Sequence, residues 1–344
     1  MSQITMMAAL ILLVSALVWA AMSAFALFEP RLRHWSAFWA SAIIICLFSP
    51  VLGLVFLYIP APYSAAYFDV PLLHGSLQAL GGLIDAPQEN PQGVGAVLWS
   101  KLFYFAGLIY LAGVCVMVAR LVIGRLRVGQ IAAQATQMSA PDVPAFWVTE
   151  RSVGAFAYTT FGRHGGSKIV IPRTLMQSLS TSELADIVRH EAAHIQRRDD
   201  EWGVVLRFIL AVCWASPFVY MLFAQWTMSA ETQSDMAVNY GHPQAQRRAY
   251  AQTLLKALKI TASRVWQYPV ASFSTRHLRS EKMRIKHILT GDVPSFKSLR
   301  HRVLLSFVAL GVTVSGALIF ASSTPIRAVA DNSVIISDLS LGLA

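Results

Sequence analysis

Charged side chains are scarce in this sequence of 344 residues. Asp, Glu, Lys and Arg make up 13% of the chain, whereas a soluble globular protein carries roughly 25%. Hydrophobic residues make up 55%, and the mean hydropathy is positive. This balance argues against an ordinary water-soluble globule and indicates that much of the protein surface faces lipid.

Cysteine is also rare. Cys46, Cys115 and Cys213 each lie within an apolar run, and none is close in sequence to another. This spacing excludes both a disulfide framework and a cysteine zinc site. We interpret the three thiols as small apolar groups packed within membrane helices.

Long apolar runs, by contrast, are abundant. A membrane helix needs roughly 20 apolar residues, and four segments meet that length: 4–28, 37–59, 97–119 and 303–322. Residues 1–28 lack a basic start and a clear cleavage site, so we expect a retained anchor rather than a signal peptide. The sequence therefore predicts a protein that is mainly α-helical, with four transmembrane helices.

Basic residues are distributed unevenly around these segments. Arg31 and Arg33 follow the first segment, the external loop at about 60–96 has no Lys or Arg, and 24 of the 28 Lys and Arg residues lie between Arg120 and Arg302. Cytoplasmic loops are enriched in Lys and Arg. We therefore expect both termini and the 60–96 loop outside, and the basic span inside.

Four regions follow from this topology. They are an N-terminal membrane domain with three spans (1–123), a cytoplasmic or membrane-surface domain (124–302), a fourth transmembrane helix (303–322) and a short external tail (323–344).

The cytoplasmic region begins with short β-like runs between Pro and Gly residues. These are 145–149, 155–161 and 168–171. The string Ser180-Thr181-Ser182-Glu183 that follows is typical of a capping box, so a helix is predicted from this point. The region is therefore expected to be α+β.

The predicted helix carries the string His190-Glu191-Ala192-Ala193-His194. Residues four apart share one helix face, so both imidazoles can reach a single ion. In the H-E-x-x-H pattern of zinc peptidases, the two histidines bind Zn2+ and the glutamate acts as the general base. We predict one Zn2+ per chain, with His190 and His194 as ligands and Glu191 as the catalytic residue.

A peptidase zinc ion needs a third protein ligand. Asp200, six residues after His194, is one candidate, but Arg197 stands where a sharp turn would favour glycine. Glu231 is the better candidate, and Asp235, one helical turn later, could accept the free ring N–H of a ligand histidine.

Residues 203–228, between these groups, are almost wholly apolar. A single membrane crossing would put Glu231 and His194 on opposite sides, where one ion could not bind both. Pro217 would interrupt a helix here. If Glu231 is a ligand, the segment must be bent or re-entrant.

Together, HEAAHIQRRD (190–199), the Trp214–Pro217 turn and the Glu231-x-x-x-Asp235 pair resemble the BlaR/MecR-type membrane metallopeptidases. The similarity also covers 162–172 and 284–289, and it extends to the four-span layout. It implies a gluzincin-like fold with His190, His194 and Glu231 as ligands, in a bacterial cytoplasmic membrane. It further implies cleavage of a cytoplasmic transcriptional repressor, or self-cleavage, after an external or membrane signal.

The chain departs from the antibiotic-sensing members of that family. It has no Ser-x-x-Lys string, and no penicillin-binding sensor domain is expected after the fourth span. β-Lactam sensing by this chain itself is therefore not expected.

Other basic groups have simpler explanations. Arg197 and Arg198, together with Asp199, are expected to form a structural ion pair or to position substrate. The basic run 276–302 is typical of positive-inside charge near lipid. No groove-reading motif accompanies it, so no direct nucleic acid binding is expected. The expected partners are a cytoplasmic protein substrate and the lipid bilayer, and a homodimer is left open.

Two alternatives share parts of this interpretation. A membrane quality-control zinc peptidase would have the same site and broader substrates. A non-catalytic membrane signal transducer would not need Glu191 or Glu231, yet both are present.

Overall fold

The computed structural model describes residues 3–58, 94–140, 143–160, 166–265 and 274–291, and the described part is mostly helical with one small sheet. The helices are α1 (Gln3–Phe28), the 3-10 helix η1 (Pro30–His34), α2 (Ser36–Tyr58), α4 (Val94–Gln134), α5 (Arg173–Ser178), α6 (Thr181–Gln196), α7 (Asp199–Val212), α8 (Pro217–Asn239), α9 (Gln244–Val265) and α10 (Ser274–Thr290). The strands are β1 (Thr136–Met138), β2 (Phe146–Thr149), β3 (Phe156–Thr159) and β4 (Ser167–Pro172).

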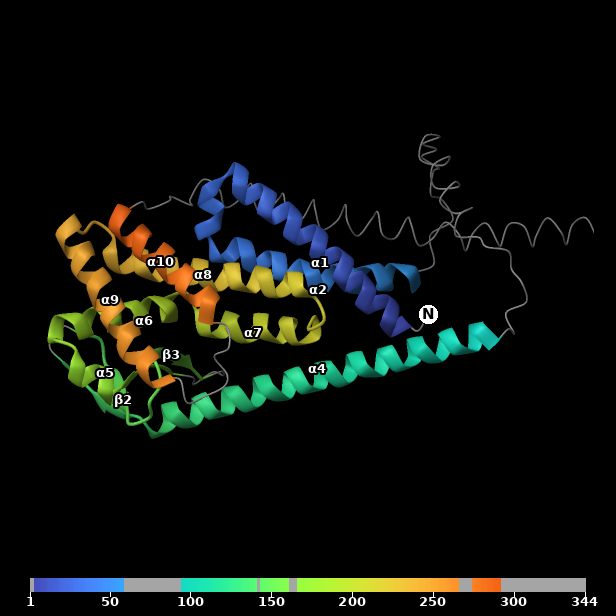
Figure 1. Ribbon diagram of the computed structural model, residues 1–344. Coiled ribbons are helices and arrows are strands. Elements are labelled where there is room, and N and C mark those ends of the chain that lie inside the picture. Colours follow the sequence, from blue (N-terminus) through green and yellow to red (C-terminus); the bar gives the residue numbers. More distant parts are fainter. Residues whose placement is uncertain (1–2, 59–93, 141–142, 161–165, 266–273, 292–344) are drawn as a thin grey trace, which may run out of the picture.

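Helices α1 and α2 pack against the α7–α8 hairpin in one apolar cluster (Figure 1). Val14 and Met22 of α1, Ile43 of α2, and Leu206 and Leu222 of the hairpin are fully buried there. Two of the described helical segments, Ala8–Phe28 and Lys101–Gln134, are long and apolar enough to cross a membrane. The α7–α8 hairpin therefore shares one apolar core with α1, which is one of these two segments.

Helix α4 is a single helix of 41 residues that runs along one side of the other helices and contacts α7 and α1 (Figure 1). The predicted third span, 97–119, and the domain boundary after residue 123 both fall within it. Gly113 marks a close approach, because a Cβ there would lie 2.3 Å from Cε2 of Trp214, next to the α7–α8 turn.

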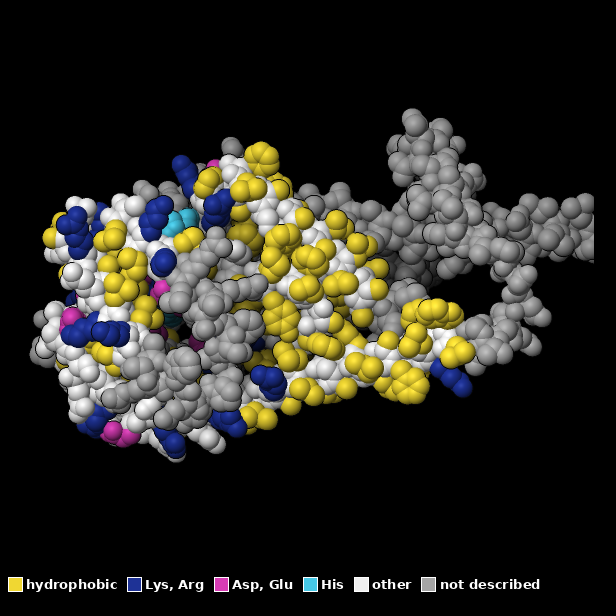
Figure 2. Space-filling model, in the orientation of Figure 1, with side chains coloured by type: hydrophobic (Ala, Val, Ile, Leu, Met, Phe, Trp, Pro, Cys, Tyr) yellow, Lys and Arg dark blue, Asp and Glu magenta, His cyan; other side chains and the backbone are white. Residues whose placement is uncertain are grey.

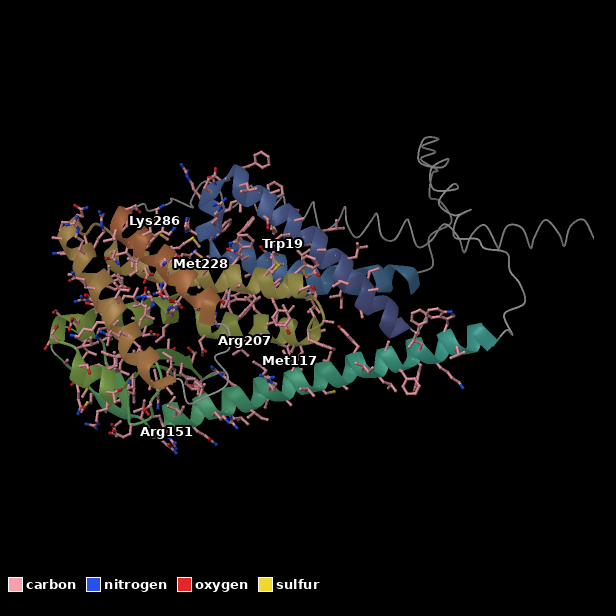
Figure 3. The ribbon with its side chains drawn as sticks, in the orientation of Figure 1. Trp19, Met117, Arg151, Arg207, Met228 and Lys286 are labelled. Carbon is pink, nitrogen blue, oxygen red and sulfur yellow. The ribbon has the colours of Figure 1, made fainter. Side chains whose placement is uncertain are left out.

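Apolar and charged side chains separate along the molecule. Figure 2 shows hydrophobic side chains over the end that holds α1 and α4, and Lys and Arg gathered at the other end. Trp19 and Met117 lie toward the apolar end, Arg151 and Lys286 lie at the charged end, and Arg207 lies between them (Figure 3). This polarity is what a membrane-associated protein with a domain outside the bilayer requires.

The sheet has the strand order β1-β2-β4-β3. Strands β2 and β4 are parallel, and β3 pairs antiparallel with β4. All three overlap the predicted runs, whereas β1 was not predicted. Ile169 and Ile171 of β4 pack against Leu184 and Val188 of α6. The sheet therefore supports the helix that carries the HEAAH string, and β3 is its edge strand on that side.

Two local sequence signals, the capping box and Pro217, form the helix starts that they predict. Ser180 accepts a hydrogen bond from the Glu183 N–H while the Glu183 carboxylate accepts one from the Ser180 N–H, which completes the capping box of α6. Pro217 occupies the first turn of α8, where its missing N–H is tolerated. The chain therefore turns back after α7, which brings α8 alongside it (Figure 1).

The predicted 60–96 loop, fourth span (303–322) and external tail (323–344) lie outside the described residues, apart from the start of α4.

Candidate metal centre

Helix α6 presents His190 and His194 on one face. Their Nε2 atoms lie 3.2 Å apart, as expected for imidazoles one turn apart that are directed at one point. His190 is 6% exposed and Glu191 is 9% exposed. The motif is therefore inside the protein rather than on a solvated helix surface.

Glu231 on α8 meets this pair. Its carboxylate oxygens lie 3.4 Å from Nε2 of His190 and 3.7 Å from Nε2 of His194. The ligand atoms of all three residues fall within 4.8 Å of one another. Asp200, the other candidate third ligand, is instead paired with Arg125 at 2.8 Å and accepts the N–H of Thr159.

A buried network orients His190 from behind. Its Nδ1 lies 3.2 Å from the Asp235 carboxylate and 3.0 Å from the hydroxyl of Tyr250 on α9. Tyr250 donates to the same carboxylate at 2.8 Å. A carboxylate in this position fixes the ring orientation and the tautomer of a metal-binding histidine.

Arg284 of α10 joins the two carboxylates of α8. Its Nε and Nη2 donate to Asp235 at 2.8 and 3.0 Å, and its Nη1 lies 3.1 Å from Glu231. The Arg284 side chain is 6% exposed. Its positive charge is thus committed to the site and is unavailable to lipid.

His194 has its own carboxylate partner. Its Nδ1 lies 2.8 Å from Asp199, which also pairs with Arg197. Arg197 donates to the Ala230 carbonyl and the Ser234 hydroxyl, at 2.9 and 2.7 Å. Asp199 therefore links the second histidine to the helix that carries Glu231.

Arg198 has a different position. Its φ of 59° lies in the left-handed region and turns the chain between α6 and α7. Its side chain is 70% exposed and pairs with Glu201. Arg198 thus shapes the turn that presents Asp199, and its guanidinium does not reach the metal-binding residues.

The spacing of the donor atoms fits a tetrahedral zinc ion. Two ligands at ~2.0–2.1 Å from one zinc ion lie roughly 3.3 Å from each other. The three distances between donor atoms, 3.2, 3.4 and 3.7 Å, are close to that value. Because a carboxylate lies at Nδ1 of each ring, the Nε2 lone pairs are left to face the ion.

The electrostatics also favour a cation here. Burial opposes the charged form of Glu231, but Arg284 and the two imidazoles outweigh it and hold the pKa of Glu231 well below its usual range. Burial likewise opposes protonation of His190, yet Asp235 and Glu231 raise the pKa of His190 to about 10. A metal ion at this point would replace that positive charge.

Glu191 faces a cavity of about 400 Å3 that the three metal-binding residues also line. Burial raises the pKa of Glu191, while the two imidazoles and the backbone of Ala157 on β3 oppose that rise. Residues 154–157 form one wall of the cavity, and Arg207, Trp226 and Thr227 of the hairpin form another. The cavity thus joins a candidate base, a metal centre and a strand edge.

The comparisons agree with this arrangement. The family described as BlaR1 peptidase M56 matches residues 1–288. This chain belongs to the BlaR1 peptidase M56 family. Membership of this M56 family, together with the apolar helices and the His/Glu cluster, indicates a membrane-associated peptidase with a metal cofactor.

Other comparisons add little to the M56 assignment. None of the curated proteins matches the chain. The crystal structure of S. mikatae Ste24p aligns with 85% of this chain and 99% of its own chain, at 14% identity and a TM-score of 0.28. A likeness of that size does not establish a shared fold.

The structure thus brings together five of the residues singled out in the sequence of this M56 chain: His190, Glu191, His194, Glu231 and Asp235. It adds Asp199 as the partner of His194, and it adds Tyr250 and Arg284. Arg284 lies in the 284–289 stretch that carried the family resemblance, but the basic run around it gave the expectation of lipid-facing charge. Resemblance was therefore the only sequence signal for Arg284.

Proposed function

We propose that this chain is a membrane-embedded zinc endopeptidase that cleaves a cytoplasmic protein, with His190, His194 and Glu231 as ligands. The observation that carries the proposal is the convergence of these residues on one point beside Glu191. Bound zinc supplies a Lewis acid that polarises a peptide carbonyl and acidifies a water. Two imidazoles and one carboxylate form the gluzincin-type ligand set.

Glu191 is the proposed general base. Its carboxylate lines the cavity, as does Ala157 of β3. Burial raises its pKa above that of a free glutamate, which suits a group that takes a proton from the attacking water and passes it to the leaving amine. Asp235 and Asp199 hold the two imidazoles in the tautomer that binds metal.

Substrate main chain is proposed to bind along β3, because β4 lies inside the sheet and β3 forms the edge. At Thr159 the backbone carbonyl accepts a hydrogen bond from Arg125 and the backbone N–H donates to Asp200. The part of the edge left for a substrate strand is therefore the part nearest Gly154–Ala157. That part lines the cavity, as strand addition by an extended peptide requires.

The finer parts of the proposal follow from topology and resemblance. They are four membrane spans, a re-entrant 203–228 segment, a cytoplasmic site in a bacterial inner membrane, and a transcriptional repressor or the chain itself as substrate. A repressor-specific enzyme would cleave one cytoplasmic protein at one bond, whereas a quality-control peptidase would cleave many unfolded proteins.

The test compares the wild type with Glu191→Gln in detergent, with Glu201→Gln in the first turn of α7 as the matched control. Bound zinc is measured by mass spectrometry, and cleavage is measured on an unfolded protein such as casein and on the chain itself. We expect about one zinc per chain in all three proteins and fragments only from the wild type and the control.

Absence of zinc from all three would refute the ligand assignment. Zinc without any difference in cleavage would favour the signal transducer.

A further inference from the structure

A second cavity lies beside α8, and Asp235 separates it from the metal-binding cluster. It has a volume of about 280 Å3 and is enclosed by α8, the α8–α9 turn and α10. One water takes up roughly 30 Å3 of liquid. The cavity therefore has room for a molecule larger than a simple ion.

Two polar atoms in its wall lack hydrogen-bond partners. Asn239 is 8% exposed, and its Nδ2 donates to the Asp235 carbonyl at 2.7 Å. This bond fixes the orientation of the amide and leaves Oδ1 without a donor. Among the described residues, three buried side-chain nitrogen or oxygen atoms are unpaired, and two of them, Asn239 Oδ1 and Arg247 Nε, belong to residues that line this cavity. Unpaired buried polar groups are costly, so the presence of two of them in one cavity wall needs an explanation.

The wall also carries groups that favour an anion. Arg247, His242 and His287 line it. The Arg247 guanidinium lies over Gly291, where a Cβ would be 2.0 Å from Nη1. The acidic residue of the wall, Asp235, already has its carboxylate neutralised by Arg284. The cavity wall therefore offers the guanidinium of Arg247 as a cationic donor and the bare amide oxygen of Asn239 as an acceptor.

The cavity is close to the connection between two apolar helices. The ring of His287 lies edge-on to the ring of His34, with centroids 4.4 Å apart. His34 ends η1, which joins α1 to α2. Because α1 is long and apolar enough to span a membrane, this side of the cavity lies where lipid headgroups would be found.

We propose that this cavity binds a phosphate ester that also carries a hydroxyl or an amine. The phosphate oxygens accept hydrogen bonds from Arg247 and the histidines, and the hydroxyl or ammonium group donates to Asn239 Oδ1. The source is either a phospholipid headgroup or a soluble phosphate ester. Arg284 is one helical turn before His287 on α10. An occupant would therefore also brace α10, whose Arg284 side chain contacts Asp235 and Glu231.

The experiment uses the full chain purified in detergent and follows its unfolding temperature as each probe is titrated. The lipid probes are phosphatidylethanolamine and phosphatidylcholine, which have the same net charge, but only the first has N–H donors. The soluble probes are sn-glycerol 3-phosphate and inorganic phosphate. Arg247→Gln is compared with Arg248→Gln, an exposed neighbour on the same helix.

We expect the wild type and Arg248→Gln to be stabilised by phosphatidylethanolamine and not by phosphatidylcholine. Arg247→Gln should bind about tenfold more weakly, because it lacks the charged donor. Stabilisation by sn-glycerol 3-phosphate as well would assign the site to soluble esters, and stabilisation by the lipid alone would assign it to a headgroup.

Equal responses from the two arginine variants, equal stabilisation by the two lipids, or no response to any probe would overturn the proposal. If Arg247→Gln does not fold, Arg247→Lys provides the second test. It keeps the charge but lacks the planar fork of N–H donors, so it should weaken binding in the same direction.

Discussion

Arg284 is the residue on which the two carboxylates of α8 depend. It bonds Asp235 through two nitrogens and lies 3.1 Å from Glu231, and its side chain is 6% exposed. Removing one partner of a buried ion pair leaves an uncompensated charge and costs about 3–5 kcal/mol. We therefore expect Arg284→Gln to lower the unfolding temperature of the chelator-treated chain by several degrees.

Lys286→Gln is the matched control, because Lys286 lies on the same helix and is exposed. Thermal unfolding followed by tryptophan fluorescence in detergent would separate the two variants. If they were equally stable, the carboxylates would not need the guanidinium.

Asp199 should control metal affinity through His194. Its carboxylate lies 2.8 Å from Nδ1 of that ring, and loss of such a partner typically lowers metal affinity about 10–100-fold. We expect this loss in Asp199→Asn, measured by competition with a chromogenic zinc chelator. Glu201→Gln, in the same first turn of α7, should bind zinc as the wild type does; a similar loss there would indicate a general disturbance of the turn.

Residues of the site differ in how far the sequence could predict them. His190, Glu191 and His194 share one helix face, so helical periodicity predicts their convergence. Glu231 could be predicted as a ligand only with the additional condition that the apolar segment 203–228 turns back toward the HEAAH helix. Tyr250 and Arg284 come from helices whose packing on α8 leaves no local pattern, and Asp199 reaches His194 only because Arg198 adopts a left-handed conformation.

At the scale of elements, the contact between α4 and the α7–α8 turn depends on Gly113. Trp214 donates to the Tyr110 carbonyl at 3.0 Å, and the Tyr110 hydroxyl donates to the Val212 carbonyl at 2.6 Å. The Trp214 ring fills the space beside Gly113. Because overpacking costs about 1–3 kcal/mol, Gly113→Ala should destabilise the chain.

Gly124→Ala is the control on the same helix, since a Cβ there meets nothing within 4 Å. Alanine favours helix by about 1 kcal/mol over glycine, so this variant should be as stable as the wild type or more stable. Thermal unfolding of both variants in detergent gives the comparison. A Gly113→Ala chain that unfolded at the Gly124→Ala temperature would show that the tryptophan moves aside freely.

Elements with local signals were predicted closely, and those fixed by distant contacts were not. The capping box fixes the start of α6 at Thr181, and Pro217 marks the start of α8. Strand order follows from long-range pairing, so the sequence did not indicate that β3 rather than β4 forms the edge. Helix α4 continues to Gln134 through a basic stretch, whereas hydropathy alone would end the helix near residue 119.

At the scale of the whole molecule, the charge distribution predicts the sidedness of the site. Of the 28 Lys and Arg residues, 24 lie between Arg120 and Arg302, and basic segments stay in the cytoplasm. The test uses Ser139→Cys and Gln78→Cys in a chain where exposed Cys115 is replaced by alanine. An impermeant maleimide should label Cys at position 78 in cells with an intact inner membrane, and at position 139 only after the membrane is opened. The reverse pattern would put the α6 metal centre outside, where a cytoplasmic repressor could not be its substrate.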